Sequence, residues 1–180
     1  MSRLPEGLVA IGIVRSSRTT LADTPVQSAL NPDEVATVEI DEAYVDGLDG
    51  LAGFDHAWLL TWLGESHDTQ ARAPLRQVPY LLQGERREIG IFATRGPRRL
   101  NPIGLSLVRV VEISGAQVRF RGVDLLDGTV VIDLKPYVTA FDGPGGTPRC
   151  GWFDEVALPR GATPATLDPT QRPGPTSAQR

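Results

Sequence analysis

The chain of 180 residues contains one cysteine, Cys150, and only two histidines, His56 and His67. One cysteine cannot form an internal disulfide, and this set is too small for a Cys/His zinc site, so we expect no bound metal. No apolar run reaches the roughly 20 residues of a membrane-spanning helix. Residues 1–7 also lack the apolar segment of a secretory signal peptide. These absences favour a cytoplasmic protein that does not contact a membrane.

Lysine is almost absent: of the 18 basic residues, only Lys135 is a lysine. The net charge of −4 argues against a protein that coats nucleic acid through bulk electrostatics, which requires many neutralised phosphates. A local patch remains compatible with this charge, and arginine forks suit phosphate and carboxylate groups. The alternative is a set of solvated surface charges. Five arginines fall within one short window: Arg86, Arg87, Arg95, Arg98 and Arg99.

Long helical patterns are scarce, and 19 glycines and 15 prolines punctuate the chain. Short β-rich runs separated by turn residues are typical of an all-β or mostly-β barrel or sandwich. The expected strands are residues 8–15, 35–40, 57–63, 89–94, 105–113, 116–122, 124–126 and 129–134.

Two dipeptides predict hairpins between these strands. Ser114-Gly115 is one, and Asp127-Gly128 is the stronger signal. Helices are expected only as short pieces, at residues 31–35 and at 75–83, where Pro79 would interrupt the helix. We expect one domain over residues 1–158 and a flexible tail over 159–180, because residues 161–180 have little to bury.

General motifs for catalysis are missing. The chain has no P-loop, no G-x-S-x-G elbow and no G-x-G-x-x-G fingerprint at a strand–helix junction. His56, beside Asp55, could act as an acid or base, or could be structural. Asp124 and Asp127 could serve the turn itself. Residue chemistry alone therefore indicates a mostly-β domain and no particular reaction.

Four blocks nevertheless resemble one family. They read I-G-I-V-R-S from Ile11, G-L-A-G-F-D-H-A-W-L-L-T-W-L from Gly50, I-G-I-F-A-T-R-G-P-R-R-L-N-P-I-G-L-S-L from Ile89, and G-V-D-L-L-D-G-T-V-V-I-D-L-K-P-Y from Gly122. Their order and spacing are similar to those of the TrmO family, also called YaeB or TsaA-like. The resemblance covers roughly residues 8–142.

This resemblance implies a fold and an activity. Members use S-adenosylmethionine to methylate N6 of threonylcarbamoyl-adenosine 37 in tRNA. Their methyltransferase domain is a β-barrel and not a Rossmann fold, and it works as a homodimer with the cofactor near the subunit interface. The single barrel with few short helices that we expect here agrees with that architecture.

The resemblance also implies which residues bind the cofactor. Arg95 matches an arginine that contacts it and could hold the methionine carboxylate. A family His followed by Gln or Glu is replaced by Gly64-Glu65, so only Glu65 supplies a polar side chain there. The remaining matched positions are Pro25, Val26, Gln27, Leu105, Asp124, Leu125, Leu126 and Asp127.

Further signature residues are expected at the active-site mouth or the dimer interface, where they would contact the substrate: Arg98, Arg99, Asn101, Lys135 and Tyr137. The base that removes a proton from the acceptor is not identified by the resemblance. His56 and Asp124 are the two candidates.

The chain departs from the family in three places. It lacks the C-terminal domain with an Asp-Pro-Arg-Pro-x-Tyr motif, and Arg98 and Leu100 stand where an aromatic residue and a proline are usual. These departures weaken the inference of the specific substrate, and not that of the cofactor. From the four blocks and the arginine cluster, the leading hypothesis is a tRNA methyltransferase. A small-molecule methyltransferase of the same family is the first alternative, and a non-catalytic module that binds S-adenosylmethionine is the second.

Overall fold

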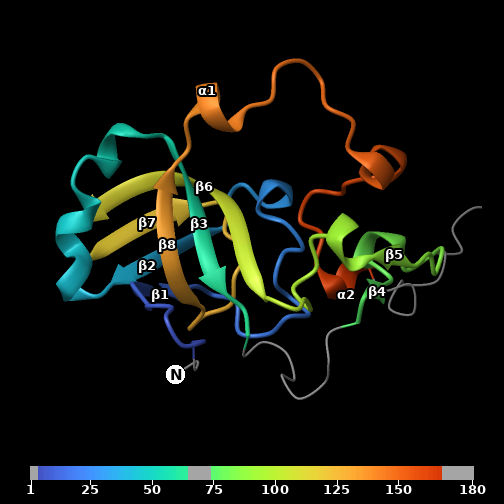
Figure 1. Ribbon diagram of the computed structural model, residues 1–180, viewed down its shortest axis with the longest axis horizontal. Coiled ribbons are helices and arrows are strands. Elements are labelled where there is room, and N and C mark those ends of the chain that lie inside the picture. Colours follow the sequence, from blue (N-terminus) through green and yellow to red (C-terminus); the bar gives the residue numbers. More distant parts are fainter. Residues whose placement is uncertain (1–3, 65–73, 168–180) are drawn as a thin grey trace, which may run out of the picture.

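Six strands close into one barrel in the computed structural model, which describes residues 4–64 and 74–167 (Figure 1). Around the barrel the order is β1-β2-β7-β6-β3-β8, all neighbours are antiparallel, and β8 pairs back with β1. Closure leaves this sheet without a free edge. The predicted mostly-β barrel is confirmed. Its strands are β1 Gly12–Arg15, β2 Val35–Ile40, β3 His56–Trp62, β6 Ile103–Ser114, β7 Gln117–Arg121 and β8 Val130–Pro136.

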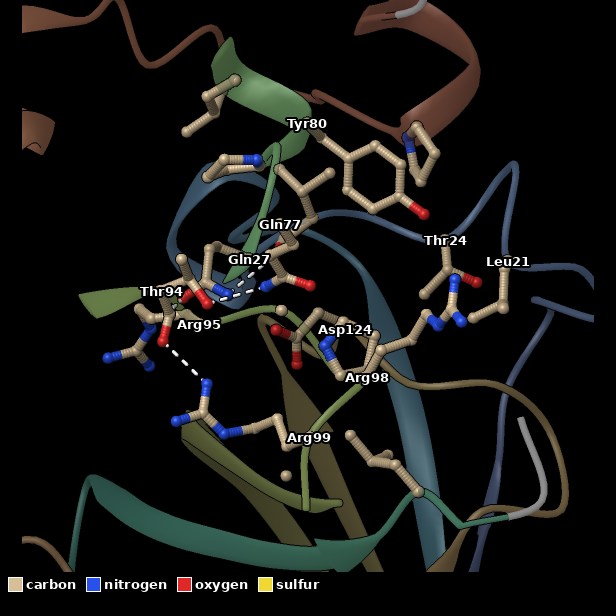
Figure 2. A pocket seen from close by; sticks show the side chains of 18 of the residues that line it. Leu21, Thr24, Gln27, Gln77, Tyr80, Thr94, Arg95, Arg98, Arg99 and Asp124 are labelled. Carbon is tan, nitrogen blue, oxygen red and sulfur yellow. Dashed lines mark hydrogen bonds between the residues drawn. The ribbon is translucent and has the colours of Figure 1, made fainter. Parts of the chain in front are cut away.

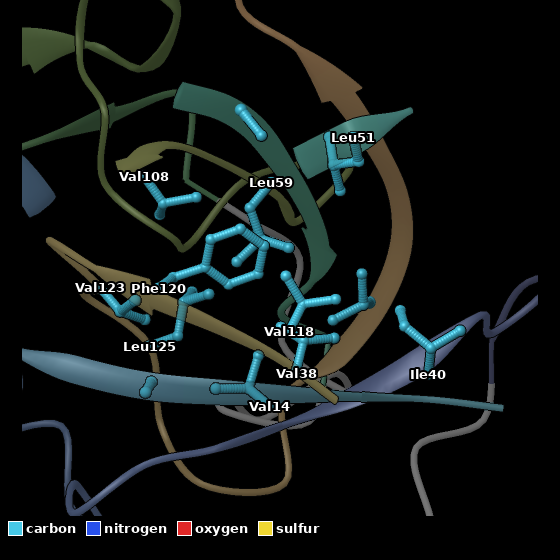
Figure 3. Close-up of a cluster of buried hydrophobic side chains, with 13 residues drawn as sticks. Val14, Val38, Ile40, Leu51, Leu59, Val108, Val118, Phe120, Val123 and Leu125 are labelled. Atoms are coloured by element: carbon cyan, nitrogen blue, oxygen red, sulfur yellow. The ribbon is translucent and has the colours of Figure 1, made fainter. Parts of the chain in front are cut away.

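Alternation along the strands fills the barrel. In β2 and β7 every second residue is buried, because side chains of a strand point to opposite faces in turn. The register places Ala36 opposite Phe120 and Val38 opposite Val118, so the inward residues of the two strands meet. Figure 3 shows Phe120 among these side chains. The core comprises Val14, Ala36, Val38, Ile40, Leu51, Ala57, Leu59, Val108, Val118, Phe120, Val123, Leu125 and Val131.

The hairpin predicted at Ser114-Gly115 is confirmed, one residue further along the chain. Ser114 still pairs with Gln117, so Gly115 and Ala116 form the two-residue loop. Gly115 has a φ of +56°, the left-handed conformation that glycine adopts without steric penalty.

The stronger hairpin signal, Asp127-Gly128, is wrong. A turn does form there, since the Thr129 amide donates to the Leu126 carbonyl at 3.2 Å. However, β7 and β8 are not neighbours in the barrel, and residues 124–126 are not a strand. The Asp127-Gly128 dipeptide predicts the turn correctly. In the closed barrel, however, the chain crosses one end of the barrel between β7 and β8.

A lobe of short elements stands at one end of the barrel. It contains β4 Arg76–Gln77 paired with β5 Ile89–Gly90, and the 3-10 helices η4 Tyr80–Leu82 and η5 Ile91–Ala93. The predicted strand 89–94 is thus correct only for its first two residues. The helix predicted at 75–83 is reduced to the turn that follows Pro79, as expected from a proline at that place.

Other short elements lie outside the lobe. The short helical piece expected at 31–35 is reduced to one turn after the 3-10 helix η1 Ser28–Leu30, in which the Glu34 amide donates to the Asn31 carbonyl at 3.2 Å. The 3-10 helices η2 Glu42–Leu48 and η3 Leu51–Gly53 connect β2 to β3, and Figure 1 shows them at the barrel end away from the lobe.

Three short helices follow β8: α1 Thr139–Asp142, the 3-10 helix η6 Gly151–Glu155 and α2 Pro164–Leu167. The expectation of disorder from residue 161 does not hold up to residue 167. Ala162 is buried and accepts a hydrogen bond from the Val26 amide at 2.9 Å, and the Ala165 amide donates to the Ala22 carbonyl at 3.0 Å. Backbone pairing needs no large side chain, so composition could not reveal it.

Candidate functional site

A cleft of about 630 Å³ lies between the lobe and the end of the barrel (Figure 2). The barrel side is formed by residues 103–106 at the start of β6 and residues 124–126 after β7. The other walls come from residues 21–27, from residues of the lobe between 74 and 99, and from the C-terminal segment. Segments far apart in sequence therefore build one site.

Asp124 is the one acidic side chain of the described lining. Ser106 Oγ donates to Oδ1 at 2.5 Å, and the Ser28 amide donates to Oδ2 at 3.0 Å. The residue keeps some contact with the cleft, but its carboxylate lies deep among protein atoms. This desolvation raises the pKa of Asp124 above its ordinary value, while the two hydrogen bonds and the charge of Arg95 act against the rise.

Arg95 also lines the cleft, on an exposed segment after η5, and its charge acts on Asp124. Its Nε donates to Gln27 Oε1 at 2.6 Å, and Nη2 donates to the Leu105 carbonyl at 3.4 Å. Within the described residues these contacts use two of five N–H groups of the guanidinium, so the fork can still bind a carboxylate. Gln27 thereby fixes the arginine in place.

The two neighbouring arginines differ from each other. Arg99 donates through Nη1 to the carbonyls of Ile91 and Thr94, at 3.0 and 2.9 Å, and so caps the carbonyl end of η5. Arg98 is exposed, and Figure 2 shows it extending toward Leu21 and Thr24. Arg98 is thus available to an anionic ligand, whereas Arg99 holds the lobe together.

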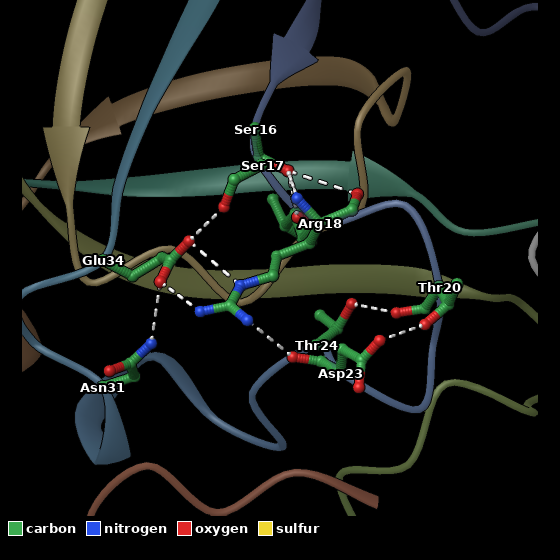
Figure 4. A network of polar contacts seen from close by, with 9 residues as sticks. Ser16, Ser17, Arg18, Thr20, Asp23, Thr24, Asn31 and Glu34 are labelled. Atoms are coloured by element: carbon green, nitrogen blue, oxygen red, sulfur yellow. Dashed lines mark hydrogen bonds and ion pairs between the residues drawn. The ribbon is translucent and has the colours of Figure 1, made fainter. Parts of the chain in front are cut away.

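A polar network fixes the loop that carries the wall of residues 21–27 (Figure 4). Arg18 and Glu34 form two hydrogen bonds, Nε to Oε1 at 3.0 Å and Nη2 to Oε2 at 2.6 Å. The hydrogen bond from Arg18 is the main cause of the lowered pKa of Glu34. The Arg18 carbonyl also accepts from the Asp127 amide at 2.7 Å, which ties this loop to the turn after Asp124.

The structure brings together most of the residues expected at the cofactor. Gly64 and Asp127 are outside the lining, and Asp127 accepts instead from the Ser16 amide at 3.2 Å. Glu65 lies outside the described residues. The expected residues that line the cleft are Pro25, Val26, Gln27, Arg95, Leu105, Asp124, Leu125 and Leu126.

The residues expected at the substrate are divided. Arg98 and Arg99 line the cleft, whereas Asn101, Lys135 and Tyr137 do not. Tyr137 packs edge-on against His56 and Trp58, with ring centroids 6.5 and 6.0 Å apart. His56 begins β3, six residues before its end at Trp62, which amounts to about 20 Å at the usual rise of a strand.

Sequence reasoning missed several residues of the cleft. Ser106 could have been found, because it occupies an inward position of β6 between Gly104 and Val108, where an apolar residue is expected. No comparable signal marks Gln77, Tyr80, Trp152 and Phe153, whose positions depend on the fold of the lobe and the C-terminal segment.

Among residues 4–64 and 74–167, no three His, Cys, Asp or Glu side chains gather as a metal ion would require. No helix in the same part of the chain is long and apolar enough to cross a bilayer.

Comparisons with known proteins identify the family of this barrel. Residues 13–143 match the family described as the tRNA-methyltransferase O N-terminal domain. The crystal structure of TrmO from Pseudomonas aeruginosa superposes with a TM-score of 0.68 at 31% identity, over 86% of this chain and 65% of that chain. The chain belongs to the TrmO family.

Relatives carry names of two kinds. A probable S-adenosyl-L-methionine-binding protein of Methanothermobacter thermautotrophicus is 40% identical over 145 residues, 81% of this chain and 99% of that protein. The tRNA (adenine(37)-N6)-methyltransferase of Mus musculus is 33% identical over 138 residues, 74% of this chain and 31% of that protein. The chain thus spans less than two thirds of the solved TrmO chain and about one third of the mouse enzyme.

Proposed function

We propose that this chain is an S-adenosylmethionine-dependent methyltransferase that acts on N6 of threonylcarbamoyl-adenosine 37 in tRNA. Membership of the TrmO family and the names of the relatives support the cofactor and the reaction. The observation that carries the proposal to this chain is the cleft, which Arg95 and Asp124 line together with two further arginines. A tRNA substrate also agrees with the cytoplasmic location expected from the sequence.

The side chains of the cleft suit this cofactor. Arg95, held by Gln27, would bind the methionine carboxylate through its remaining N–H groups. Asp124 would accept from ribose hydroxyls or face the positive charges of the cofactor. Val26, Leu105 and Leu125 add apolar surface for the adenine ring. When bound, S-adenosylmethionine supplies a methyl group already activated on a sulfonium.

Because the methyl group is activated, the protein has mainly to align the acceptor and to remove its proton. Asp124 is the better of the two candidate bases, because it reaches the cleft and burial raises its pKa above its ordinary value. Ser106 and the Ser28 amide hold its carboxylate in one orientation. His56 lies at the far end of β3 and outside the lining, so we assign it no role in proton transfer.

Between a tRNA and a small molecule as acceptor, the charge of the cleft favours tRNA. A small apolar acceptor would suit an enclosed apolar pocket, whereas Arg95 and Arg98 are exposed at this cleft. Exposed arginines can bind the phosphates that flank a nucleotide. A net charge of −4 then matters less than the local arrangement.

We also propose a homodimer, formed through the outer face of β3 and β6. On that face three apolar pairs lie side by side in register: Trp58 with Leu107, Leu60 with Leu105, and Trp62 with Ile103. Lys135 lies opposite Trp58 on β8, and Tyr137 contacts the same tryptophan. Ile103 and Leu105 also line the cleft, so a second copy on this face would approach the cofactor site.

Calorimetric titration with S-adenosylmethionine tests the cofactor site. We expect Arg95→Ala to weaken binding by about 1.5–3 kcal/mol, roughly 10- to 150-fold, because a charge-assisted contact is lost. Arg119→Ala is the matched control, since that arginine pairs with Glu112 on the exposed surface of the barrel. Equal affinities of the two variants for S-adenosylmethionine would show that Arg95 does not contribute to cofactor binding.

The acceptor is tested separately, by nucleoside analysis of tRNA from a strain that lacks the gene and from the same strain complemented with it. We expect the N6-methylated form of threonylcarbamoyl-adenosine to disappear and to return on complementation. Unchanged methylation at adenosine 37, together with normal cofactor binding, would contradict tRNA as the acceptor and leave the small-molecule alternative.

A further inference from the structure

The C-terminal segment contributes a wall of the cleft, although it lies outside residues 13–143 that match the family domain. Trp152 and Phe153 of η6 and Pro164 at the start of α2 all line the cleft. The family domain alone therefore does not complete this site. The function of the added wall is the question that the geometry raises.

The wall is anchored to both neighbouring walls. Trp152 Nε1 donates to the Ala93 carbonyl of the lobe at 2.7 Å, and Glu155 pairs with Arg87 at 2.7 Å. On the other side, Ala162 accepts from the Val26 amide at 2.9 Å. These contacts hold the segment in place between the lobe and residues 21–27, so its aromatic side chains have fixed positions.

Two aromatic rings form the centre of this wall. Trp152 and Phe153 are stacked, with ring centroids 3.8 Å apart and an angle of 24° between the rings. Trp152 is only 8% exposed and its N–H group is already paired, so it serves as backing. Phe153 is half-buried and lines the cleft, so it is the ring that a ligand can reach.

The lining of the cleft combines two kinds of surface. Asp124, Arg95 and Gln27 gather the charged and hydrogen-bonding groups on the barrel side. Val78, Tyr80 and Phe153, which also line the cleft, add a surface that is mostly apolar and aromatic. A flat ring without charge, such as a nucleobase, stacks on surfaces of the second kind.

We propose that Phe153, backed by Trp152, is the stacking surface for the methyl-accepting adenine of the RNA. This inference rests on the proposed function and identifies residues that recognise its acceptor. Both the cofactor and the acceptor contain adenine. We assign the stack to the acceptor because the groups that suit the charged cofactor lie on the barrel side, which leaves this wall for the second adenosine.

Binding of anticodon stem-loop RNA, measured by fluorescence anisotropy in the presence of S-adenosylhomocysteine, tests the inference without turnover. Two RNAs are compared, one with adenine at position 37 and one abasic there. We expect the wild type to bind the adenine RNA about tenfold more tightly, as stacking of one base would give. Phe153→Leu should lose this preference, and Phe153→Tyr should keep it.

Phe141→Leu is the matched control, because that phenylalanine is 85% exposed on α1 and does not line the cleft. Cofactor affinity, measured for each variant, shows whether the site is still folded. Wild type that binds both RNAs equally, or Phe153→Leu that retains the preference, would overturn the inference. So would a Phe153→Leu variant that loses affinity for the cofactor and not for the adenine RNA. Base-dependent binding without methyl transfer would instead refute the proposed function and keep the stacking site.

Discussion

Phe120 and Asp124 are four residues apart, yet they lie in opposite surroundings. Phe120 ends the inward row of β7, is fully buried and packs in the apolar core of the barrel. Asp124 follows just beyond the end of that strand, where the chain leaves the barrel and enters the cleft. The same stretch of chain thus passes from the apolar core that stabilises the fold to the lining of the cleft.

Burial affects the free energy of folding differently in the barrel and in the cleft. In the barrel, burial of apolar side chains is the favourable contribution to folding. In the cleft, burial of the Asp124 carboxylate is unfavourable for its charged form. Hydrogen bonds from Ser106, from the Ser28 amide and from its own amide, together with the charge of Arg95, compensate in part. A protein tolerates such a group where function requires it, so we expect substitutions in the two regions to have opposite effects on stability.

The largest effect is expected for Phe120→Ala. Removal of a fully buried phenylalanine from the core should lower the free energy of unfolding by about 3–5 kcal/mol, because the lost contacts leave a cavity. Urea denaturation followed by circular dichroism measures the change. Phe141→Ala, at an exposed site, should stay within about 0.5 kcal/mol of the wild type. Similar losses for both variants would contradict the assigned core.

Gly104 stands at the boundary between the two regions. It pairs with Thr61 across β3 and β6 and also lines the cleft. An added Cβ would overlap with the Thr61 hydroxyl, which is buried and has no hydrogen-bond partner among the described residues, and would meet Leu63 Cδ1 at 3.3 Å. We expect Gly104→Ala to lower the free energy of unfolding by about 1–3 kcal/mol.

Gly47→Ala is the matched control for thermal unfolding of this variant, because a Cβ at Gly47 meets no atom within 4 Å. The double variant Thr61→Ala, Gly104→Ala should recover part of the loss, since the overlapping hydroxyl is removed. No recovery would show that the strain arises elsewhere than at this contact.

Prediction from the sequence also differs between the barrel and the cleft. The barrel strands can be predicted because alternation along a strand is a local pattern, and the strand predicted at residues 35–40 has the same bounds as β2. The residues expected at the cofactor follow from the family resemblance, and most of them line one cleft. The same alternation could have identified Ser106, because it is a polar residue at an inward position of β6.

The remaining features depend on contacts distant in sequence. The turn at Asp127-Gly128 is correctly marked by its residues, but nothing local shows that the strands beside it pair with others. Residues 161–167 contain few side chains to bury and are held through backbone groups of Ala22, Val26 and Leu30. Such pairing is set by the folded surface against which a segment lies, and composition does not encode it.

A smaller loss of stability is expected when an ion pair is removed, and its size should differ between a pair beside the cleft and a pair on the barrel surface. Glu34 accepts from Arg18, Ser17 and Asn31, and its side chain is 13% exposed, whereas that of Glu112, paired with Arg119, is 57% exposed. We expect Glu34→Gln to lower the free energy of unfolding at pH 7 by about 1.5 kcal/mol. Glu112→Gln should change it by less than about 1 kcal/mol.

The pH dependence gives this prediction a second readout. The pKa of Glu34 is lowered in the folded state, so its stabilising contribution is present above its ordinary pKa of 4.5 and is lost as the pH falls through the folded value. The difference between wild type and Glu34→Gln should therefore shrink on acidification in urea titrations. A difference that is constant down to acid pH would contradict the ion pair as its source.

The smallest change in stability is expected for Asp124→Asn, and it has the opposite sign. The amide is isosteric with the carboxylate, can accept from the Ser28 amide and can donate to Ser106 Oγ, and it removes a buried charge.

Burial raises the pKa of Asp124 in the folded state. Its contribution to stability is therefore fully present below the ordinary pKa of 3.8 and is lost as the pH rises through the folded value. Relative to wild type, the variant should thus gain stability as the pH rises from about 4 toward 7, while its affinity for S-adenosylmethionine falls about tenfold with the lost charge. Urea titrations at several pH values and calorimetry of cofactor binding, applied to the same two proteins, measure both effects. A variant that is less stable than wild type at pH 7 would show that the carboxylate supports the fold, and the contrast between barrel and cleft would fail at the residue where it should be sharpest.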